Sequence, residues 1–255
     1  MLKASDEDHG ALPAVSFAFQ AIVDVAAQRT YSYEALIRGQ DGQPAHRIFK
    51  QVPESALYAF DDAARIQALD LAARLRLECC LNLNCLPRSL YHSSTALAST
   101  AEAALRHGFA LEQIILEVTE GEMIDDHARF IAAVNEFRAQ GLKLAIDDFG
   151  AGYSGLNLLV EFQPDVLKLD MALVRGIESR GPRQAVVRAI LGACADLGID
   201  VIAEGVETAN EYDWFMQEGV RLFQGYLFGK PVFERLPLPV WPVNCDAAIV
   251  ENAGE

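Results

Sequence analysis

Residues 126–148 read DHARFIAAVNEFRAQGLKLAIDD, and this stretch indicates how the chain folds. Apolar residues recur at helical spacing up to Gln140, and Gly141 then marks the end of the predicted helix. The apolar run 142–146 follows at once and predicts a buried strand, and two aspartates come directly after it. A helix joined to a buried strand by a single glycine is typical of a repeating α/β unit with a parallel sheet.

The same alternation of apolar runs and helical patterns extends in both directions from this stretch. We predict strands at residues 15–25, 31–37, 79–83, 114–118, 142–146, 166–169, 201–203 and near 222–223. We predict helices at residues 56–77, 94–107, 126–140, 154–162, 183–197 and 208–218. Strands that alternate with helices in this number favour an α/β fold of the TIM-like (β/α)8 barrel type, in a single domain. Because no helix separates the first two strands, we expect an antiparallel or irregular first strand.

The composition limits the classes of protein that the chain can represent. Its 255 residues are 51% hydrophobic, which is enough for a sizeable core, and they carry a formal net charge of −15. This charge argues against long nucleic acids and anionic membranes as partners, since both attract clustered positive charge. No apolar run approaches the length of a membrane span, and the start lacks a signal-peptide pattern, so we expect a cytoplasmic protein. We expect a barrel domain at residues 13–240 with flexible tails at 1–12 and 241–255.

Polar and charged residues stand within or just after seven of the predicted strands. They are Glu34, Asn84, Glu117, Asp147 with Asp148, Lys168, Glu204 and Gln224. Because the carboxyl ends of parallel strands converge on one face of a barrel, we expect these side chains to lie together. Carboxylates buried in one place need cations to stay ionised, and hard oxygen ligands suit Mg²⁺ or Mn²⁺. Two divalent ions and one lysine would balance the five negative charges, and two metals that share a carboxylate suit phosphodiester hydrolysis.

Simpler explanations exist for single members of this set. A glutamate or asparagine at one strand end is more often a cap or a solvated loop residue, and Asp147 and Asp148 could cap the next helix. Lys168 inside an apolar run is harder to explain in this way, because a buried lysine needs a partner. Residues 150–155 also match the GxGxxG pattern of dinucleotide-binding proteins. We expect no NAD site there, because the two aspartates before the glycines would repel a pyrophosphate.

Six ordered motifs resemble those of the EAL-domain cyclic di-GMP phosphodiesterases and extend over nearly the whole chain. They are EALIRG at 34–39, LEVTE at 116–120, IDDFGAGYS at 146–154, LKLD at 167–170, AEGVET at 203–208 and QGY at 224–226. The segment NCLP at 84–87 resembles the metal-binding asparagine segment of the family, and Pro87 favours Asn84 over its rival Asn82. The resemblance implies an enzyme that hydrolyses cyclic di-GMP to linear pGpG by in-line attack of metal-bound hydroxide.

The resemblance also implies which residues hold metal ions and act on water. One ion, Mg²⁺ or Mn²⁺, is expected to bind Glu34, Asn84, Glu117 and Asp147, and a second is expected to bind Asp147, Asp148 and Glu204. Lys168 would orient or polarise the attacking water, and we group it with Asp147 and Glu204 as the catalytic residues.

Further roles implied by the resemblance concern the substrate and the surroundings of the metal ligands. Arg38 would grip a phosphate of cyclic di-GMP, and Gln224 would sit beside the metal water or the substrate. Glu120 resembles the glutamate that anchors the loop at 148–154, while Asp170 and Glu207 resemble partners of the ligands. A homodimer is also expected. The alternative is a receptor or scaffold that binds cyclic di-GMP without turnover and acts through protein partners; the intact motifs favour hydrolysis.

Overall fold

The computed structural model describes residues 12–92, 96–119, 124, 126–152, 159, 160 and 162–242. Eight strands close into a barrel in the order β2-β3-β4-β5-β6-β7-β8-β1, with β1 also paired to β2. Their bounds are β1 Val15–Asp24, β2 Arg29–Gly39, β3 Cys80–Asn84, β4 Ile114–Thr119, β5 Lys143–Phe149, β6 Val166–Leu169, β7 Asp200–Ala203 and β8 Leu222–Phe223. The fold is therefore the single-domain TIM-like barrel that the sequence predicts. Its closed sheet is not the open sheet of dinucleotide-binding domains, which leaves the GxGxxG pattern without its usual context.

The first strand closes the barrel in an antiparallel sense. β1 pairs with β2 along its length, so that Gln20 faces Glu34, and its end pairs antiparallel with β8, where Val23 faces Phe223. From β2 to β8 every neighbouring pair is parallel. A short connection between β1 and β2 can make only a hairpin, and this confirms the expected antiparallel first strand.

A ninth strand, β9 (Val232–Phe233), was not predicted from the sequence. It pairs antiparallel with β1, on the edge of β1 that also carries β8. The chain after β9 stays against the barrel, because the hydroxyl of Tyr33 donates to the carbonyl of Pro237 at 2.9 Å. A strand of two residues has no alternation that a sequence pattern could reveal.

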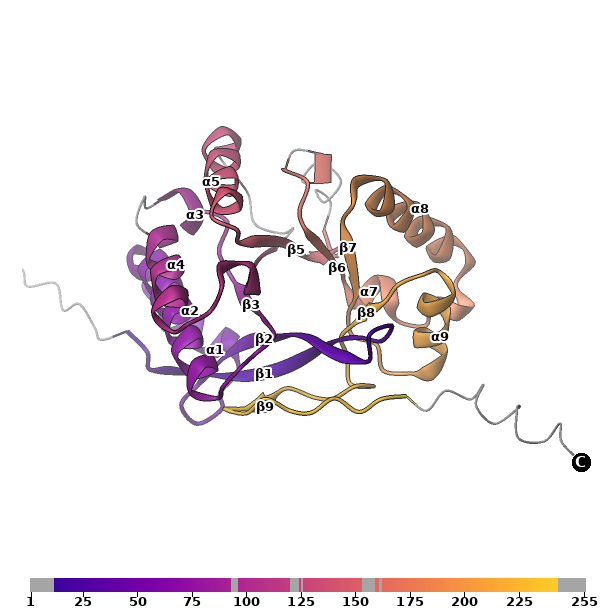
Figure 1. The fold of residues 1–255 in the computed structure, drawn as a ribbon, viewed down its shortest axis with the longest axis horizontal. Coiled ribbons are helices and arrows are strands. Elements are labelled where there is room, and N and C mark those ends of the chain that lie inside the picture. Colours follow the sequence, from indigo (N-terminus) through magenta and orange to yellow (C-terminus); the bar gives the residue numbers. More distant parts are fainter. Residues whose placement is uncertain are drawn as a thin grey trace, which may run out of the picture.

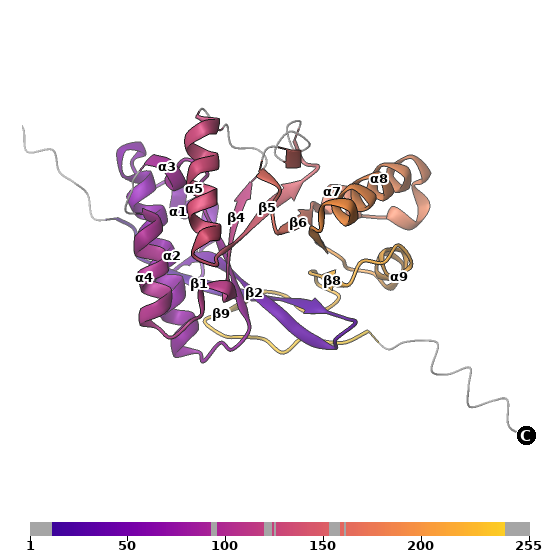
Figure 2. The same ribbon diagram turned by 45° about the horizontal axis from the view of Figure 1, so that its top comes forward.

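Helices surround the barrel, with α2 to α5 on one side and α7 to α9 on the other (Figures 1 and 2). They are α1 Ala45–Phe49, α2 Leu57–Arg74, α3 Ser89–His92, α4 Ala96–Arg106, α5 His127–Ala139, α7 Met171–Val174, α8 Gly181–Leu197 and α9 Ala209–Gln217. The short helices α1, α3 and α7 were not predicted, because each has only four or five residues, little more than one helical turn, and so shows no repeating apolar pattern. The predicted helix at 154–162 lies mostly outside the described residues. Among the helices in the described ranges, none is long and apolar enough to cross a membrane.

The barrel interior is built in layers two residues apart, because alternate residues of a strand face inward. The apolar layer consists of Ile22, Ile115, Ala145, Val166, Ile202 and Leu222. Two positions further along the parallel strands stand charged or amide side chains, and on the antiparallel β1 the step runs backward from Ile22 to Gln20. The polar layer consists of Gln20, Glu34, Asn82, Glu117, Asp147, Lys168, Glu204 and Gln224. It lies at the carboxyl end of the parallel strands, where barrel enzymes build their sites.

Candidate functional site

Lys168 occupies the centre of the polar layer and is 1% exposed. Its Nζ lies 2.7 Å from Oε1 of Glu117, 2.9 Å from Oδ1 of Asp147 and 2.7 Å from Oε1 of Glu204. A fourth carboxylate, that of Glu34, lies 3.4 Å away. These carboxylates come from β2, β4, β5 and the end of β7, so the converging strands gather them around one ammonium group, as the sequence predicts.

Amide side chains on β3 and just after β8 donate hydrogen bonds to these carboxylates. Gln224 donates to Oε2 of Glu34 at 2.7 Å, and Asn84 donates to Oε1 of Glu34 at 3.1 Å. Asn82, two residues earlier on β3, donates to Oε1 of Glu117 at 2.8 Å and is fully buried. The structure thus brings both Asn84 and its rival Asn82 to the site, each against a different glutamate.

A bulge in β5 turns two neighbouring aspartates toward the same place. In a regular strand Asp147 and Asp148 would point to opposite faces. The register between β5 and β6 shifts between Ile146 and Phe149, and Asp148 has a φ of 53°. Aspartate tolerates this left-handed conformation better than most residues. As a result, carboxylate oxygens of Asp147, Asp148 and Glu204 lie within 4.8 Å of one another.

The crowding of acids alters their protonation. Burial raises the pKa of Glu117 and of Glu204 well above that of an ordinary carboxyl, although Lys168 opposes it. Burial acts on Glu34 in the same direction, but Lys168 and the hydrogen bonds from amide side chains outweigh it and lower its pKa. Burial and the neighbouring Asp147 raise the pKa of Asp148 to about 6. Additional positive charge at the site would therefore stabilise the ionised form of these carboxyl groups.

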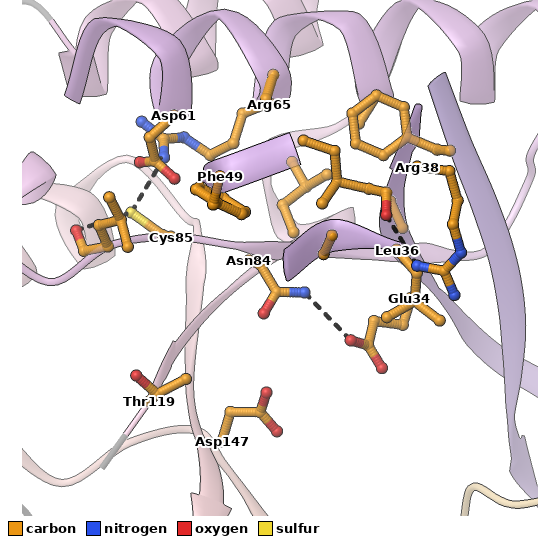
Figure 3. A pocket seen from close by; sticks show the side chains of 18 residues that line it. Glu34, Leu36, Arg38, Phe49, Asp61, Arg65, Asn84, Cys85, Thr119 and Asp147 are labelled. Carbon is orange, nitrogen blue, oxygen red and sulfur yellow. Dashed lines mark hydrogen bonds and ion pairs between the residues drawn. The ribbon is translucent and has the colours of Figure 1, made fainter. Parts of the chain in front are cut away.

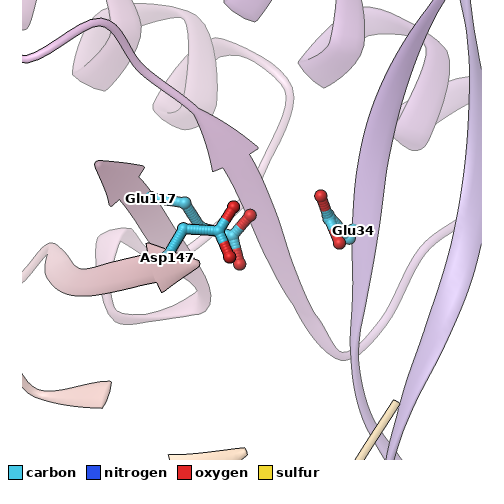
Figure 4. Close-up of side chains that lie close together, drawn as sticks. All are labelled: Glu34, Glu117 and Asp147. Carbon is cyan, nitrogen blue, oxygen red and sulfur yellow. The ribbon is translucent and has the colours of Figure 1, made fainter. Parts of the chain in front are cut away.

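Two groups of carboxylates can each hold a metal ion, and Asp147 belongs to both. The first group is Glu34, Glu117 and Asp147, and Figure 4 shows Glu117 and Asp147 side by side with Glu34 facing them. The second group is Asp147, Asp148 and Glu204. Among the described residues, the buried Oε2 of Glu117 and Oδ1 of Asn82 have no hydrogen-bond partner, so each has a lone pair to offer. This all-oxygen donor set fits Mg²⁺ or Mn²⁺.

Two cavities adjoin these two carboxylate groups, and Glu34 and Asp147 line both cavities. The first, of about 370 Å³, extends between β2, α1 and α2 and has mainly apolar walls (Figure 3). The second, of about 400 Å³, lies on the side of β6, β7 and β8 and is lined by Arg175, Glu207 and Tyr226 among others. We refer to them as the apolar cavity and the polar cavity.

The remaining residues singled out in the sequence lie around these cavities. Arg38 lines the apolar cavity, and its Nη1 donates to the carbonyl of Ile37 at 2.8 Å. Asp170 lines the polar cavity and caps α7, because its Oδ1 accepts from the backbone N–H of Ala172 at 2.7 Å. Glu207 forms an ion pair with Arg175 at the same cavity. Glu120 lies outside the described residues.

Gln20 was missed in the sequence although it belongs to the polar layer. Its Nε2 donates to the carbonyl of Gly229 at 3.0 Å, and its Oε1 accepts from Gln224 at 3.3 Å. A signal was present, since Gln20 shares a strand face with Ile22 inside an apolar run. Because β1 runs antiparallel to its neighbours, Gln20 at the site precedes the inward apolar residue Ile22 in the sequence. On the parallel strands the polar residue follows the apolar one, and Gln20 does not fit that pattern.

The protein is thus an α/β barrel with a cluster of carboxylates, able to hold metal ions, at the carboxyl ends of its strands. The EAL domain family model matches residues 11–231, and the chain belongs to this family.

Known relatives and solved structures agree with this assignment. The chain is 35% identical over 227 residues to the blue light- and temperature-regulated antirepressor BluF of Escherichia coli, covering 89% of this chain and 56% of that protein. It thus spans about half the length of this curated relative. A calcium and cyclic di-GMP complex of Klebsiella pneumoniae BlrP1 superposes with a TM-score of 0.86 at 42% identity, covering 95% of this chain and 61% of that one. A standalone EAL protein of Vibrio cholerae, bound to cyclic di-GMP, gives a TM-score of 0.86 at 40% identity and coverages of 91% and 98%.

Proposed function

We propose that this protein is a metal-dependent phosphodiesterase that hydrolyses cyclic di-GMP to linear pGpG. The observation that carries the proposal is the pair of carboxylate groups that share Asp147 around the buried Lys168. Relatives named as cyclic di-GMP phosphodiesterases, such as PdeR of Escherichia coli at 39% identity over 126 residues, support the substrate. Complexes of BlrP1 with manganese and cyclic di-GMP support both the ligand and the metal.

The residues of the chain divide the work of such a reaction. Glu34, Asn84, Glu117 and Asp147 would hold one divalent ion, and Asp147, Asp148 and Glu204 would hold the other. When bound, two Mg²⁺ or Mn²⁺ ions would lower the pKa of water and neutralise charge on the phosphoryl oxygens. Lys168 would donate a hydrogen bond to the attacking water, because its ammonium group is held at the centre of the site.

Substrate binding would use the two cavities on either side of the metal-binding groups. A cyclic dinucleotide has two nucleosides joined by two phosphodiesters, so one phosphodiester at the centre leaves a nucleoside for each cavity. Arg38 at the apolar cavity would bind a phosphate through its guanidinium group, and Gln224 would contact the substrate or the water. Asp170 and Glu207 would support the ligands from the polar cavity, and Glu120 would anchor the loop at 148–154.

Hydrolysis is tested by incubating the purified protein with cyclic di-GMP and saturating Mg²⁺ or Mn²⁺. We expect pGpG to accumulate, as measured by chromatography, and EDTA to stop its formation. Intact cyclic di-GMP after prolonged incubation with either metal would contradict the proposal.

Binding without turnover is the second candidate function, and the antirepressor name of the relative BluF favours it. A receptor would bind cyclic di-GMP and release it unchanged, while a protein partner responds to the bound form. The same incubation distinguishes the two functions, provided that equilibrium dialysis confirms binding. We also propose that the protein is a homodimer and that it is located in the cytoplasm. Light scattering of the purified protein tests the dimer.

A further inference from the structure

Glu211 is a buried carboxylate outside the metal-binding groups, with 4% of its surface exposed. It lies in the first turn of α9 and forms a capping box with Thr208. Its backbone N–H donates to Oγ1 of Thr208 at 3.2 Å, and the backbone N–H of Thr208 donates to Oε2 of Glu211 at 3.1 Å. This reciprocal pair of hydrogen bonds is the capping box that begins α9.

The carboxylate of Glu211 accepts two more backbone hydrogen bonds that helix capping does not require. The N–H of Glu207 donates to Oε2 at 2.9 Å, and the N–H of Gly176 donates to Oε1 at 3.0 Å. Gly176 follows α7 and belongs to the connection after β6, whereas Glu207 belongs to the loop after β7. One side chain therefore joins two loops that both border the polar cavity.

Arg175 reinforces this junction. Its guanidinium group pairs with the carboxylate of Glu207, and its Nη1 lies 4.0 Å from Oε2 of Glu211. The carbonyl of Arg175 in turn accepts from Nη1 of Arg183 at 2.6 Å. Arg175 and Glu207 also line the polar cavity next to Glu204, so the junction adjoins the second carboxylate group.

The loop that carries Glu204 has little freedom between its neighbours. The N–H of Glu204 donates to the carbonyl of Leu169 at 3.2 Å, and the N–H of Val206 donates to the carbonyl of Gln224 at 3.1 Å. A Cβ atom added to Gly205 would lie 2.8 Å from Cβ of Met171, so the loop is pressed against α7. The loop after β7 is thus packed against α7 on one side and bonded to Gln224 on the other. The hydrogen bond from the N–H of Glu207 to Glu211 then fixes the direction in which this loop leaves Glu204.

We propose that Glu211 is a positioning residue for the second metal-binding group. By holding the loops after β6 and β7 together, it keeps the carboxylate of Glu204 beside those of Asp147 and Asp148. The inference rests on the proposed function only in assuming that this group binds a divalent ion.

Binding of Mn²⁺ to the metal-free protein tests the inference without any turnover. Free Mn²⁺ is measured by electron paramagnetic resonance in the wild type and in Glu211→Gln, without nucleotide. We expect one of two bound ions to be held about tenfold more weakly in the variant, the scale typical of residues that orient metal ligands. The matched control is Glu218→Gln at the other end of α9, where Oε1 of Glu218 lies 2.7 Å from Nη2 of Arg188. This control variant should bind Mn²⁺ as the wild type does. Equal isotherms for Glu211→Gln and the wild type would overturn the inference.

Two further variants separate positioning from folding. Thr208→Ala removes the capping hydroxyl, but the carboxylate of Glu211 still accepts from the backbone N–H groups of Glu207 and Gly176. We therefore expect a lower melting temperature and an unchanged Mn²⁺ isotherm. An equal loss of Mn²⁺ affinity in this variant would assign the effect to the helix start and overturn the inference.

If Glu211→Gln does not fold, Arg175→Gln replaces it. We expect this variant to bind the second Mn²⁺ ion more weakly, and an unchanged isotherm would contradict the inference. Wild-type protein that binds two Mn²⁺ ions but leaves cyclic di-GMP intact would contradict the proposed function alone.

Discussion

The apolar layer and the polar layer belong to the same strands and lie two residues apart, yet they contribute opposite free energies to folding. Each apolar side chain in the barrel contributes about 25 cal/mol per Å² of buried surface. The polar layer instead desolvates four carboxylates and a lysine, and such burial costs free energy even when the charges are paired. The apolar layer therefore stabilises the fold, and this allows the polar layer to hold an arrangement of charges that is unfavourable by itself.

Asp147 belongs to both carboxylate groups, so its replacement should reduce turnover the most. Asp147→Asn removes a shared negative charge, and we expect turnover of cyclic di-GMP to fall about 10³-fold or more, the scale for loss of a central catalytic group. The measurement is pGpG formation under saturating Mn²⁺, with circular dichroism to verify folding. A rate within tenfold of the wild type would refute the two-metal assignment.

Lys168→Met tests the centre of the polar layer with a side chain of similar length. We expect turnover to fall about 10²-fold, because positioned hydrogen-bonding and proton-transfer groups contribute at least this factor. Without metal, the variant should also unfold at lower urea concentration, since it leaves buried carboxylates unpaired. Turnover within threefold of the wild type would remove Lys168 from the mechanism.

Ile22→Ala tests the apolar layer on β1, which supplies none of the proposed metal ligands. Ile22 is fully buried, and we expect the free energy of unfolding to decrease by about 2–5 kcal/mol, as for other large-to-small core substitutions. Binding of Mn²⁺ to the folded variant should remain that of the wild type. Weaker Mn²⁺ binding at unchanged stability would show that the two layers do not divide their roles as we describe.

The two asparagines on β3 should differ in how much each contributes to Mn²⁺ binding. Asn84→Ala should weaken Mn²⁺ binding about tenfold, because it removes a proposed ligand, whereas Asn82→Ala should change it less. Asn82→Ala should mainly lower stability, since it removes the amide hydrogen bond to the buried Oε1 of Glu117 and leaves Lys168 as the donor to that atom. Calorimetric Mn²⁺ titration of both variants makes the comparison, and the reverse order of affinities would identify Asn82 as the ligand.

Much of the site could be predicted, because the carboxyl ends of parallel strands lie next to one another on one face of a barrel. Glu117, Lys168 and Glu204 each follow an inward apolar residue by two positions, so the pattern that predicts the strand also predicts the direction of the charge. The antiparallel first strand could be predicted from the missing helix before β2, which is also a local feature.

The rest depends on contacts that no short pattern contains. The carboxylates of Asp147 and Asp148 lie together only because β5 has a bulge between Ile146 and Phe149. The apolar residues 142–146 contain no pattern that predicts this bulge. Glu211 has a readable capping box with Thr208, but its bond to Gly176 spans 35 residues and follows from the packing of α7 and α9 around the loop after β7. β9 pairs with β1 from the far end of the chain, and two residues carry no period.

If Asp147 is the shared ligand of a two-metal centre, a crystal should contain both ions beside it. The most direct measurement is an anomalous difference map at the manganese edge from crystals grown with Mn²⁺ and cyclic di-GMP. We expect two separate peaks, one beside Glu34, Asn84, Glu117 and Asp147 and the other beside Asp147, Asp148 and Glu204. A single peak, or peaks that leave Asp147 outside their ligand spheres, would contradict it.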